Sequence, residues 1–491
     1  MTLYDILNQV EYGATIGANT EITALTIDSR AVTDGTLFIC IRGLRSDGHD
    51  YINAAAEKGA AAIVCETMPA EIPTGVTMIQ VADARQALAH IAANFYGNPS
   101  ESLTMLGITG TNGKTSTTYF VEAIWHATGV RAGVIGTSGA RIHDEVLDIP
   151  FASSSTPDAI ELHQILRAMK DFGAAAVVME ATSHGLTQQR TEGIAYKIGM
   201  FTNLTQDHLD FHGTMEQYKT EKAKLFAACE IGVFNADDKY ALDIMQNAPC
   251  RGVTYGIDAA CDYRAKNVVL THEGVRYDVD IAGEITHIES PIPGRFTVYN
   301  TLCAIAAAAE LGIPSAAIRA GLQNLANVPG RIQSVPNDKG FGVIIDYSHT
   351  PDGVDNILSA VRGFTTNQLI AVLGCGGDRD RTKRPIMGES AGRGADYVVL
   401  TSDNPRSEQP VDIIADMLPG IQKTDCPYET EPDRRKAIFA AVQRAKPGDN
   451  IVLAGKGSED YQEFENKRRE PFDDVTVAKE ALAALDAEGK Q

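Results

Sequence analysis

The chain has 491 residues, of which 44% are hydrophobic and 22% charged, and its formal net charge is -21 at pH 7. This length exceeds what one ordinary hydrophobic core fills and favours about three domains. A chain this acidic repels nucleic acid and anionic lipid, and we expect neither as a partner. Any anionic ligand therefore needs a local positive site.

The sequence also carries no sign of membrane insertion. The first residues, MTLYDILNQVEYGA, do not join a basic segment to an apolar run, and no run of about 18 apolar residues occurs. Eight cysteines are scattered without a CxxC pair, which favours reduced thiols over a disulfide framework or a zinc site. We therefore expect a cytoplasmic protein, and we expect it to be a monomer.

Two loop-like segments divide the sequence. NPSES at 98–102 follows a small N-terminal module, and NVPGRIQSVPNDKG at 327–340 marks a second junction. We predict domains at 1–101, 102–332 and 333–491. The predicted fold class is α/β, with a central P-loop-type ATPase domain built on a mainly parallel sheet, a C-terminal Rossmann-like domain and a smaller N-terminal α/β domain.

Seven apolar runs in the second and third domains each stop abruptly at small, polar or charged residues. Continuous apolar runs are typical of strands buried on both faces of a parallel sheet. Ligands of such sheets bind beyond the carboxyl ends of the strands, where these polar clusters are expected. Although one polar strand end is often an ordinary loop, seven together predict a site. The runs are TMLGITGTNGKT, AAAVVMEATSHG, IGMFTNLTQDHLD, FGVIIDYSHTPD, LIAVLGCGGDRDR, ADYVVLTSDNPRS and NIVLAGKGSEDY.

The first of these runs leads into GITGTNGKTSTT at 107–118, a predicted anion site. A strand, a glycine turn and a helix that starts near Lys114 together present backbone N–H groups to phosphate oxygens. Lys114 adds a positive charge and Thr115 can reach a magnesium ion. The usual phosphate-binding loop has glycine five positions before the Gly113–Lys114 pair, but this chain has Ile108. A glycine-rich turn without a ligand is the alternative.

TGTNGKTS, with this departure, resembles the ATP-binding loop of the Mur ligase family, ATP-dependent enzymes that form amide bonds in the peptide stem of peptidoglycan. Folylpolyglutamate synthases share the superfamily and carry a similar loop. The resemblance implies ATP and Mg2+ as cofactors. It extends to PGRFTVYN, PGRIQ and DYSHTPD, and assigns ATP binding to Gly110, Thr111, Asn112, Gly113, Lys114, Thr115, Ser116, Asn300, Arg331, Asp346 and His349.

The resemblance also implies a metal site. Glu180 in VVMEATSHG and His208 in FTNLTQDHLD resemble metal-binding positions of the family, and Thr115 is expected to be a further metal ligand. Lys222, in HGTMEQYKTEKAKLF, matches a lysine that CO2 converts to a carbamate in the family, which would offer carboxylate-like oxygens to magnesium. Arg331 would stabilise the charge of a phosphoryl group in transfer, the alternative being a salt-bridged hinge arginine. The expected catalytic residues are Lys114, Glu180, His208, Lys222 and Arg331.

The N-terminal segment TIDSRAVTDGTLFICIRGLRSDGHDYI resembles the uridine-nucleotide recognition domain of one branch of the family. The resemblance implies that 1–101 binds the UDP-sugar and that 102–332 binds ATP and carries out ligation. The muramoyl peptide would continue into the central domain, where the family usually has Ser in place of Thr182. The expected contacts are Ser29, Leu44, Arg45, Ser46, Ser155, Thr156, Thr182, Gln188 and Arg190.

The last strand ends are expected to select the amino acid, which makes 333–491 the amino-acid-binding domain. DNPR at 403–406 resembles the family branch that adds meso-diaminopimelate to UDP-N-acetylmuramoyl-L-alanyl-D-glutamate. Diaminopimelate differs from lysine in a second carboxylate, which an arginine fork can take, while Asp403 and Glu459 can accept an ammonium group. Ser458 stands where the family usually has His. The expected contacts are Arg379, Asp403, Asn404, Pro405, Arg406, Gly455 and Glu459.

We therefore expect an ATP-dependent ligase that passes through an acyl phosphate. The D-glutamate carboxylate would attack the γ-phosphate of ATP, and the amine of diaminopimelate would then attack the activated carbonyl. The alternatives are the same ligase adding L-lysine, a folate-type glutamate ligase, and a nucleotide-binding module without catalytic activity.

Overall fold

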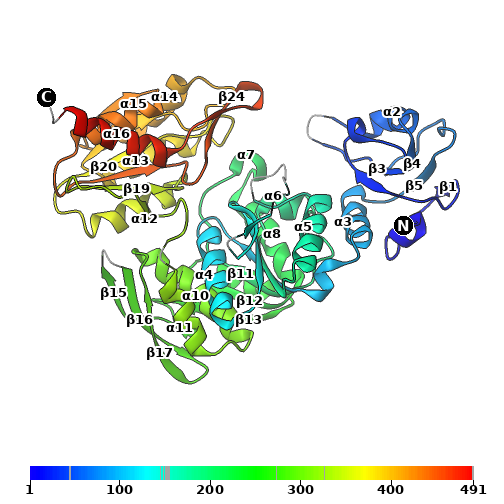
Figure 1. Ribbon diagram of the computed structural model, residues 1–491, viewed down its shortest axis with the longest axis horizontal. Coiled ribbons are helices and arrows are strands. Elements are labelled where there is room, and N and C mark those ends of the chain that lie inside the picture. The colour runs from blue at the N-terminus through cyan, green and yellow to red at the C-terminus, as the bar shows by residue number, and fades with distance from the viewer. Residues whose placement is uncertain are drawn as a thin grey trace.

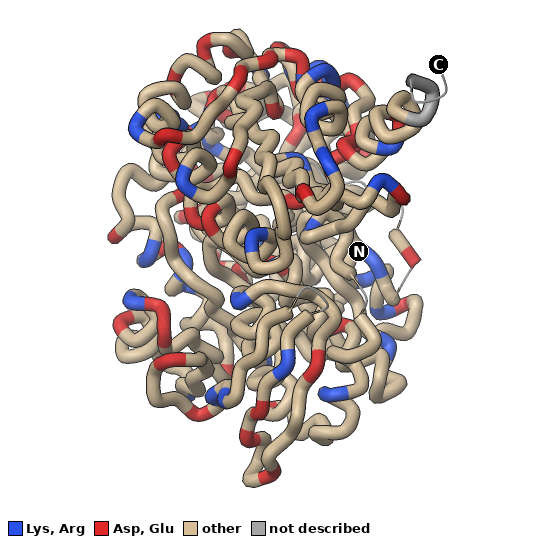
Figure 2. The backbone as a smooth tube through the Cα atoms, turned by 90° about the vertical axis from the view of Figure 1, so that its left-hand side faces the viewer, with Lys and Arg blue, Asp and Glu red and all other residues tan. Residues whose placement is uncertain are grey.

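The computed structural model describes residues 1–43, 46–143, 145–147, 149, 155–271, 274–325 and 327–488. Three lobes are visible in Figure 1: the N-terminal lobe in blue, the central one in cyan and green, and the C-terminal one in yellow to red. Figure 2 shows acidic and basic residues mixed over the face that it presents. Among the described residues, no helix is both long enough and apolar enough to cross a membrane.

The N-terminal domain is built on a five-stranded sheet in the order β1-β5-β4-β3-β2, parallel except for β1. Helix α3 starts at Ala84, and the carboxylate of the preceding Asp83 caps it by accepting hydrogen bonds from the N–H groups of Arg85 and Gln86. The elements are α1 (Leu3–Ile6), β1 (Thr15–Ile16), β2 (Ala24–Thr26), η1 (Ser29–Ala31), β3 (Thr36–Ile39), η2 (Gly48–Tyr51), α2 (Ile52–Glu57), β4 (Ala60–Cys65), β5 (Thr77–Gln80), α3 (Ala84–Phe95) and η3 (Pro99–Ser102).

The central domain contains a nine-stranded sheet in the order β14-β13-β12-β11-β6-β10-β7-β8-β9. All neighbours are parallel except β8 and β9. Its elements are β6 (Thr104–Thr109), α4 (Lys114–Thr128), β7 (Ala132–Gly136), β8 (Gly139–Ile142), β9 (Glu145–Val146), α5 (Ala159–Asp171), β10 (Ala176–Glu180), α6 (Ser183–Thr187), β11 (Tyr196–Phe201), α7 (Leu209–His212), α8 (Met215–Ala223), η4 (Lys224–Ala227), β12 (Cys229–Asn235), α9 (Ala241–Asn247), β13 (Arg251–Gly256) and β14 (Tyr263–Arg264).

An antiparallel sheet of three strands, β15-β16-β17, extends this domain, which the sequence analysis did not predict. Its signal is the alternation in GVRYDVDI, where Val275, Tyr277, Val279 and Ile281 are buried. These four side chains share one hydrophobic cluster with α10 and α4. The elements are β15 (Lys266–Thr271), β16 (Gly274–Ile281), β17 (Glu284–Ser290), α10 (Arg295–Glu310) and α11 (Ser315–Asn324).

The C-terminal domain has a six-stranded sheet in the order β18-β19-β23-β20-β21-β22, parallel except for β18. A two-stranded antiparallel ribbon, β24 and β25, lies beside it. The elements are β18 (Gln333–Ser334), β19 (Gly342–Asp346), α12 (Pro351–Arg362), β20 (Leu369–Leu373), α13 (Lys383–Gly394), β21 (Tyr397–Thr401), α14 (Pro410–Ile421), β22 (Tyr428–Glu431), α15 (Arg434–Arg444), β23 (Asn450–Ala454), β24 (Tyr461–Phe464), η5 (Glu465–Lys467), β25 (Arg468–Pro471) and α16 (Asp474–Glu488).

All seven predicted apolar runs are strands, and the predicted α/β class with three domains is confirmed. They are β6, β10 and β11 of the central sheet and β19, β20, β21 and β23 of the C-terminal sheet. Their side chains alternate between two cores: Met105 packs in one cluster and Leu106 and Ile108 in another. Burial on both faces explains why these strands read as unbroken apolar runs.

One buried ion pair joins the start of α15 to the start of α16. The side chains of Arg434 and Asp474 are both 0% exposed, with Nε 2.8 Å from Oδ1 and Nη2 2.6 Å from Oδ2. Arg434 also donates to the carbonyl oxygens of Ala454 (3.1 Å) and Ser402 (3.4 Å), next to two strand ends that the predicted site uses. The pair therefore supports the C-terminal ends of β21 and β23.

Replacing Asp474 by Asn should lower the free energy of unfolding of the C-terminal domain by about 3–5 kcal/mol, because Arg434 would stay buried without a counter-charge. Urea denaturation followed by circular dichroism measures this. The control is Asp171→Asn, since Asp171 and Arg167 form a pair that is 54% and 49% exposed and is worth about 1 kcal/mol or less. Equal losses in both variants would contradict a special role for the buried pair.

Candidate active site

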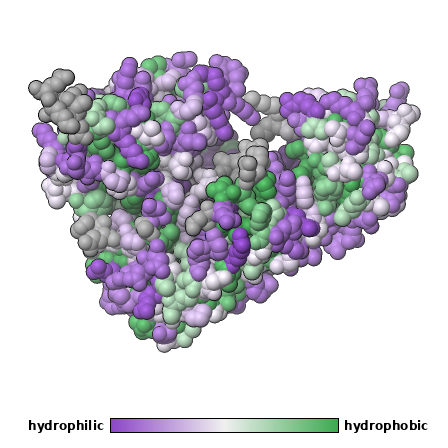
Figure 3. Space-filling view, in the orientation of Figure 1, coloured by the Kyte–Doolittle hydropathy of each residue, from purple (hydrophilic) through white to green (hydrophobic). Residues whose placement is uncertain are grey.

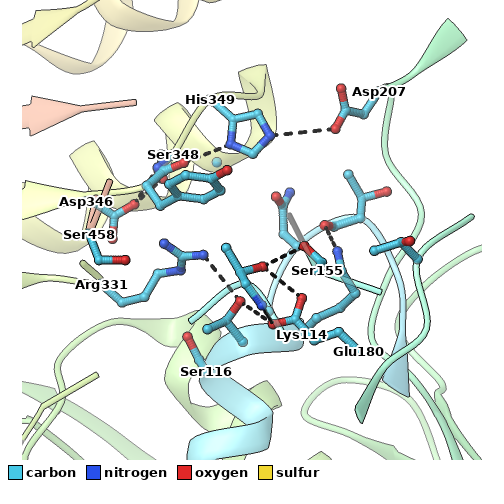
Figure 4. Close-up of a pocket in the computed structure, with 18 of the residues that line it drawn as sticks. Lys114, Ser116, Ser155, Glu180, Asp207, Arg331, Asp346, Ser348, His349 and Ser458 are labelled. Carbon is cyan, nitrogen blue, oxygen red and sulfur yellow. Dashed lines mark hydrogen bonds and ion pairs between the residues drawn. The ribbon is translucent and has the colours of Figure 1, made fainter. Parts of the chain in front are cut away.

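A pocket of about 1410 Å³ lies between the central and C-terminal domains. Its wall includes the ends of strands from both sheets, among them Lys114, Glu180 and Asp403. Figure 4 shows Lys114 and Glu180 on one side of this pocket, Asp346, His349 and Ser458 on the other, and Arg331 reaching between them. The strand ends that the sequence analysis selected in the two domains therefore meet at one place.

The glycine turn between β6 and α4 has the geometry of an anion-binding loop. Gly110 and Gly113 have φ angles of +145° and +85°, which glycine adopts without strain. A Cβ on Gly110 would lie 1.9 Å from Thr202 Oγ1, and one on Gly113 would lie 2.4 Å from Asn300 Oδ1. Helix α4 begins at Lys114 with no side-chain cap, so its first N–H groups are available to a ligand.

Two residues directly after β11, neither of them predicted from the sequence, hold this loop. Asn203 Oδ1 accepts a hydrogen bond from the N–H of Asn112 (2.9 Å), and its Nδ2 donates to the Asn112 carbonyl (3.1 Å). Thr202 Oγ1 donates to the same carbonyl at 2.7 Å. Both follow the apolar run of β11, so the polar strand end carried the signal, but only His208 was selected there.

Glu180 is the buried centre of a hydroxyl cluster at the end of β10. Its Oε1 accepts from Thr115 Oγ1 (2.9 Å) and from the N–H of Thr137 (3.0 Å), while Oε2 accepts from Thr137 Oγ1 (3.1 Å). Thr137 Oγ1 is also 2.9 Å from Ser155 Oγ. Thr115 and Glu180 thus bring hard oxygen atoms together beside the loop, a donor set that suits magnesium. Thr137 was not predicted.

Arg331 reaches the same cluster from the junction of the two domains. Its Nη2 donates to Thr115 Oγ1 at 3.4 Å, and its guanidinium lies 4.4 Å from the centroid of the Tyr347 ring. Its Nη1 donates to the neighbouring Gly330 carbonyl at 3.1 Å. No carboxylate within ion-pair distance of Arg331 is found among the described residues, so the alternative of a salt-bridged hinge arginine is not supported.

Two lysines donate to the carbonyl oxygens of the loop, Lys222 from a buried position and Lys114 from a half-buried one. Lys222 is 1% exposed, in contrast to the surface lysine that its helix suggests, and its Nζ donates to the Gly110 carbonyl at 2.7 Å. Lys114 Nζ donates to the same carbonyl at 3.0 Å and to that of Thr111 at 2.8 Å. Burial, together with the charge of Lys114, lowers the pKa of Lys222 well below its ordinary value.

His208 lies at the pocket wall beside Asp207, with its Nε2 3.3 Å from Asp207 Oδ2. Burial lowers the pKa of His208 to about 2, although Asp207 acts in the opposite direction. The imidazole is therefore neutral, as a metal ligand requires. Within the described part of the chain, no three His, Cys, Asp or Glu side chains gather into a metal-holding group. Of the four residues predicted to hold the metal, only Glu180 and His208 are of these types.

Polar contacts join the C-terminal domain to the central domain. Lys383 Nζ is 3.1 Å from Asp207 Oδ1, and both side chains are less than a tenth exposed (7% and 5%). Burial raises the pKa of Asp207, but Lys383 and the nearby imidazoles lower it by more, so the net shift is downward. Asn112 Nδ2 also donates to Asp352 Oδ2 at 2.8 Å. These contacts fix one domain over the strand ends of the other.

The residues predicted to bind ATP are brought together at this pocket. Asp346 accepts hydrogen bonds from the N–H groups of Ile332 (2.9 Å) and Ser348 (2.8 Å), which shapes the turn that carries His349. Gly110 stands behind the wall as part of the loop. The pocket also contains Asp237 and Tyr299, which were not predicted. The predicted ATP contacts on the wall are Thr111, Asn112, Gly113, Lys114, Thr115, Ser116, Asn300, Arg331, Asp346 and His349.

The residues predicted to bind the muramoyl peptide are partly gathered there. Ser155, Thr156, Thr182 and Arg190 line the pocket, and Thr156 Oγ1 is 2.8 Å from Thr182 Oγ1. Gln188 stands behind the wall, where its Oε1 accepts from Arg190 Nη2 at 2.8 Å. The hydroxyl of Thr182 caps α6 by accepting from the N–H of Gly185. The Thr in place of Ser therefore keeps a hydrogen-bonding hydroxyl at this position.

The predicted uridine contacts lie elsewhere. Ser29 is half-buried in η1, and its carbonyl accepts from Lys58 Nζ at 3.1 Å. Ser46 is exposed, and its carbonyl accepts from the N–H of Gly43 at 2.9 Å. Neither belongs to the pocket wall. Leu44 and Arg45 lie outside the described residues. In Figure 1 the N-terminal lobe is set apart from the C-terminal one, with the central domain joining them.

The predicted amino-acid contacts form the C-terminal side of the pocket. Arg379, Asp403, Asn404, Arg406, Gly455 and Glu459 line it, whereas Pro405 does not. Arg406 has a φ angle of +51°, and its Nη1 donates to the Gly377 carbonyl at 2.8 Å. Asn404 Nδ2 donates to Glu459 Oε2 at 2.9 Å. Ser458 also belongs to the wall.

Comparison with known proteins matches three family models along the chain. Residues 21–96 match the Mur ligase family catalytic domain, 108–308 the Mur ligase middle domain, and 330–457 the Mur ligase glutamate ligase domain.

Full-length relatives give the same result. UDP-N-acetylmuramoyl-L-alanyl-D-glutamate--2,6-diaminopimelate ligase 1 of Clostridium acetobutylicum is 43% identical over 99% of this chain and 100% of its own. The ligase of that name from Caldanaerobacter subterraneus is 43% identical over 98% of this chain and 99% of its own. A solved structure of such a diaminopimelate ligase has a TM-score of 0.64 and 33% identity, covering 95% of both chains. MurF from Acinetobacter baumannii, at 16% identity, TM-score 0.65 and coverage of 99% and 98%, shares the fold. The chain belongs to the Mur ligase family.

Proposed function

We propose that this chain is an ATP-dependent ligase that adds meso-diaminopimelate to UDP-N-acetylmuramoyl-L-alanyl-D-glutamate in peptidoglycan precursor synthesis. The observation that carries the proposal is the single pocket that contains the loop around Lys114, the carboxylate of Glu180 and the strand ends with Asp403 and Arg406. The names of relatives that are 40–43% identical over nearly the whole chain supply the two substrates. A monomeric state and a cytoplasmic location remain predictions.

The residues of the loop would activate the acceptor. The γ-phosphate of ATP would sit against the N–H groups of the loop, with Lys114 and Arg331 offsetting its charge. The D-glutamate carboxylate then attacks this phosphorus, ADP leaves, and an acyl phosphate forms. The amine of diaminopimelate attacks the acyl carbon, and phosphate leaves with the bonding electrons of the broken C–O bond. No side chain of the chain needs to become a covalent nucleophile.

Thr115, Glu180, His208 and carbamylated Lys222 would hold magnesium, which supplies positive charge at the phosphate oxygens when bound. The fit rests on the shared contacts of Thr115 and Glu180 and on the neutral imidazole of His208. As an ammonium group, Lys222 would oppose a cation. Its lowered pKa favours the neutral amine, whose nitrogen can add to CO2 and release a proton to give a carbamate.

The C-terminal side of the pocket would select the amino acid. The guanidinium groups of Arg379 and Arg406 suit the distal carboxylate of diaminopimelate, and Asp403 and Glu459 suit an ammonium group. L-Lysine lacks that carboxylate and would leave Arg379 and Arg406 without this substrate partner, although Arg406 Nε also lies 3.6 Å from Glu463 Oε2. Ser29, together with the segment around Ser46, would bind the UDP moiety in the N-terminal domain, and Ser155, Thr156, Thr182 and Arg190 the peptide.

Three alternatives are less well supported. The curated relatives are named for diaminopimelate, not for L-lysine. A folylpolyglutamate synthase of Mycobacterium tuberculosis matches at 19% identity, which shows a shared fold only. A non-catalytic nucleotide-binding module has no need of the second set of strand ends that lines the pocket.

Replacing Lys114 by Ala should reduce substrate-dependent ADP release by about 10³-fold, because a preorganised positive group at the transferred phosphate is lost. A coupled assay for ADP with both substrates present measures this. Lys197→Ala is the matched control, since Lys197 is a surface lysine paired with Glu230. Near-normal ligation by Lys114→Ala would refute the role of the loop.

Lys222 should carry a carbamate at neutral pH, because its lowered pKa favours the neutral amine that adds to CO2. Protein equilibrated with ¹³C-labelled bicarbonate should show a carbamate carbonyl resonance by NMR, which Lys222→Ala should lack. Lys224→Ala, which removes a nearby lysine paired with Glu221, should keep the resonance. A spectrum without it in the parent protein would rule out the modification.

Arg406→Ala should lower the preference for diaminopimelate over L-lysine by about 10²-fold, since the distal carboxylate loses a charged partner. A competition assay with both amino acids and mass analysis of the product gives the ratio. Arg393→Ala, at a surface arginine paired with Glu389, should leave the ratio unchanged. An equal preference in the parent and in Arg406→Ala would overturn the specificity argument.

A further inference from the structure

Lys456 is a fully buried cation behind the proposed amino-acid site. It lies two residues after β23, its side chain is 0% exposed, and it does not belong to the pocket wall. Its Nζ is 3.1 Å from Glu459 Oε2 and 3.1 Å from Asn404 Oδ1. A buried ammonium group is costly without partners, and these two side chains, both of which line the pocket, stabilise it together with the Tyr461 ring, whose centroid is 5.6 Å from Nζ.

The contacts of Lys456 fix the orientation of Asn404. The Asn404 Oδ1 atom accepts from Lys456 and from the N–H of Glu463 (2.9 Å), so the amide nitrogen points the other way, toward Glu459 Oε2 at 2.9 Å. With both donors on its acceptor side, the amide cannot reverse without losing all three hydrogen bonds.

The same contacts orient Glu459. Its Oε2 atom accepts from Lys456 and Asn404, whereas Oε1 accepts only a long hydrogen bond, from the Tyr347 hydroxyl at 3.4 Å, within the described residues. The side chain of Glu459 is 21% exposed. Oε1 is therefore the oxygen that remains available to an ammonium group in the pocket.

Lys456 also sets the charge of this end of the pocket. Other buried cations near these strand ends already have counter-charges: Arg434 is paired with Asp474, and Arg384 with Glu408 and Asp416. Loss of the Lys456 charge would make the site one unit more negative. L-Lysine is one unit more positive than diaminopimelate at neutral pH, because it has two ammonium groups and only one carboxylate. A more negative site attracts the more positive amino acid.

We propose that Lys456 is a positioning residue that determines amino-acid specificity: it holds Glu459 and Asn404 in place and keeps the site from favouring a substrate with a net positive charge, such as L-lysine. This inference rests on the proposed function. Lys456 acts through its two neighbours and does not touch the substrate.

Two variants separate charge from hydrogen bonding. Lys456→Gln keeps donors at this position but removes the charge, and Lys456→Met removes both with a side chain of similar length. We expect kcat/KM for diaminopimelate relative to L-lysine to fall about tenfold in Lys456→Gln and further in Lys456→Met. KM for ATP should stay within about twofold of the parent, which a general loss of structure would not allow. Lys423→Met, at a lysine 63% exposed and paired with Glu389, is the control.

A double-variant cycle tests the route through Glu459. In Glu459→Gln, which lacks the carboxylate, adding Lys456→Gln should change the ratio by less than it does in the parent, because the positioning of the carboxylate is no longer at stake and only the charge of Lys456 is lost. The inference is overturned if Lys456→Gln folds with the ratio of the parent, or if both Lys456 variants lose activity with ATP and both amino acids alike. A parent protein that ligates neither amino acid would instead contradict the proposed function. Failure of the inference can therefore be told apart from failure of the proposed function.

Discussion

The structure depends on one geometric constraint: parallel strands of one sheet have their carboxyl ends at the same edge, so the residues that follow these strands lie close together. The central sheet places the ends of β6, β10 and β11 together, and the C-terminal sheet does the same for β19, β20, β21 and β23. The two edges face one pocket because the domains are joined across it by Lys383 and Asp207 and by Asn112 and Asp352. A nucleotide-binding edge and an amino-acid-binding edge can then serve one reaction without either sheet changing its topology.

Electrostatics explains how so acidic a chain can use anionic substrates. Figure 3 shows a largely hydrophilic surface with hydrophobic residues gathered near the middle of the central domain, and the net charge is -21. The positive groups of the site are partly shielded from water: Lys222 is buried under the loop, Lys114 is half-buried at the pocket wall, and Arg331 lies against Tyr347. Burial strengthens their effect on a phosphate, because little water screens it. It also lowers the pKa of both lysines, which links the site to the proposed chemistry of Lys222.

The sequence predicted what depends on local pattern. Strands buried on both faces, the glycine turn before Lys114 and the polar residues at strand ends follow from neighbouring residues, and the structure contains them. The burial of Lys222, the support of the loop by Asn203 and the contacts of Lys456 depend on segments far apart in the chain, so no local pattern reveals them. The antiparallel strands β15 to β17 had a readable alternation that the search for unbroken apolar runs passed over. The uridine contacts remain predictions: Ser29 and Ser46 lie away from the pocket, and Leu44 and Arg45 are outside the described residues.

The central claim is that the acceptor carboxylate attacks the γ-phosphate of ATP in this pocket, so that one carboxylate oxygen leaves with the phosphate released. The most direct measurement uses UDP-N-acetylmuramoyl-L-alanyl-D-glutamate labelled with ¹⁸O in the D-glutamate carboxylate, followed by mass analysis of the phosphate released. An acyl phosphate requires one labelled oxygen to appear in each phosphate formed during ligation. Phosphate that contains no label, while the labelled acceptor is converted to product, would contradict the account.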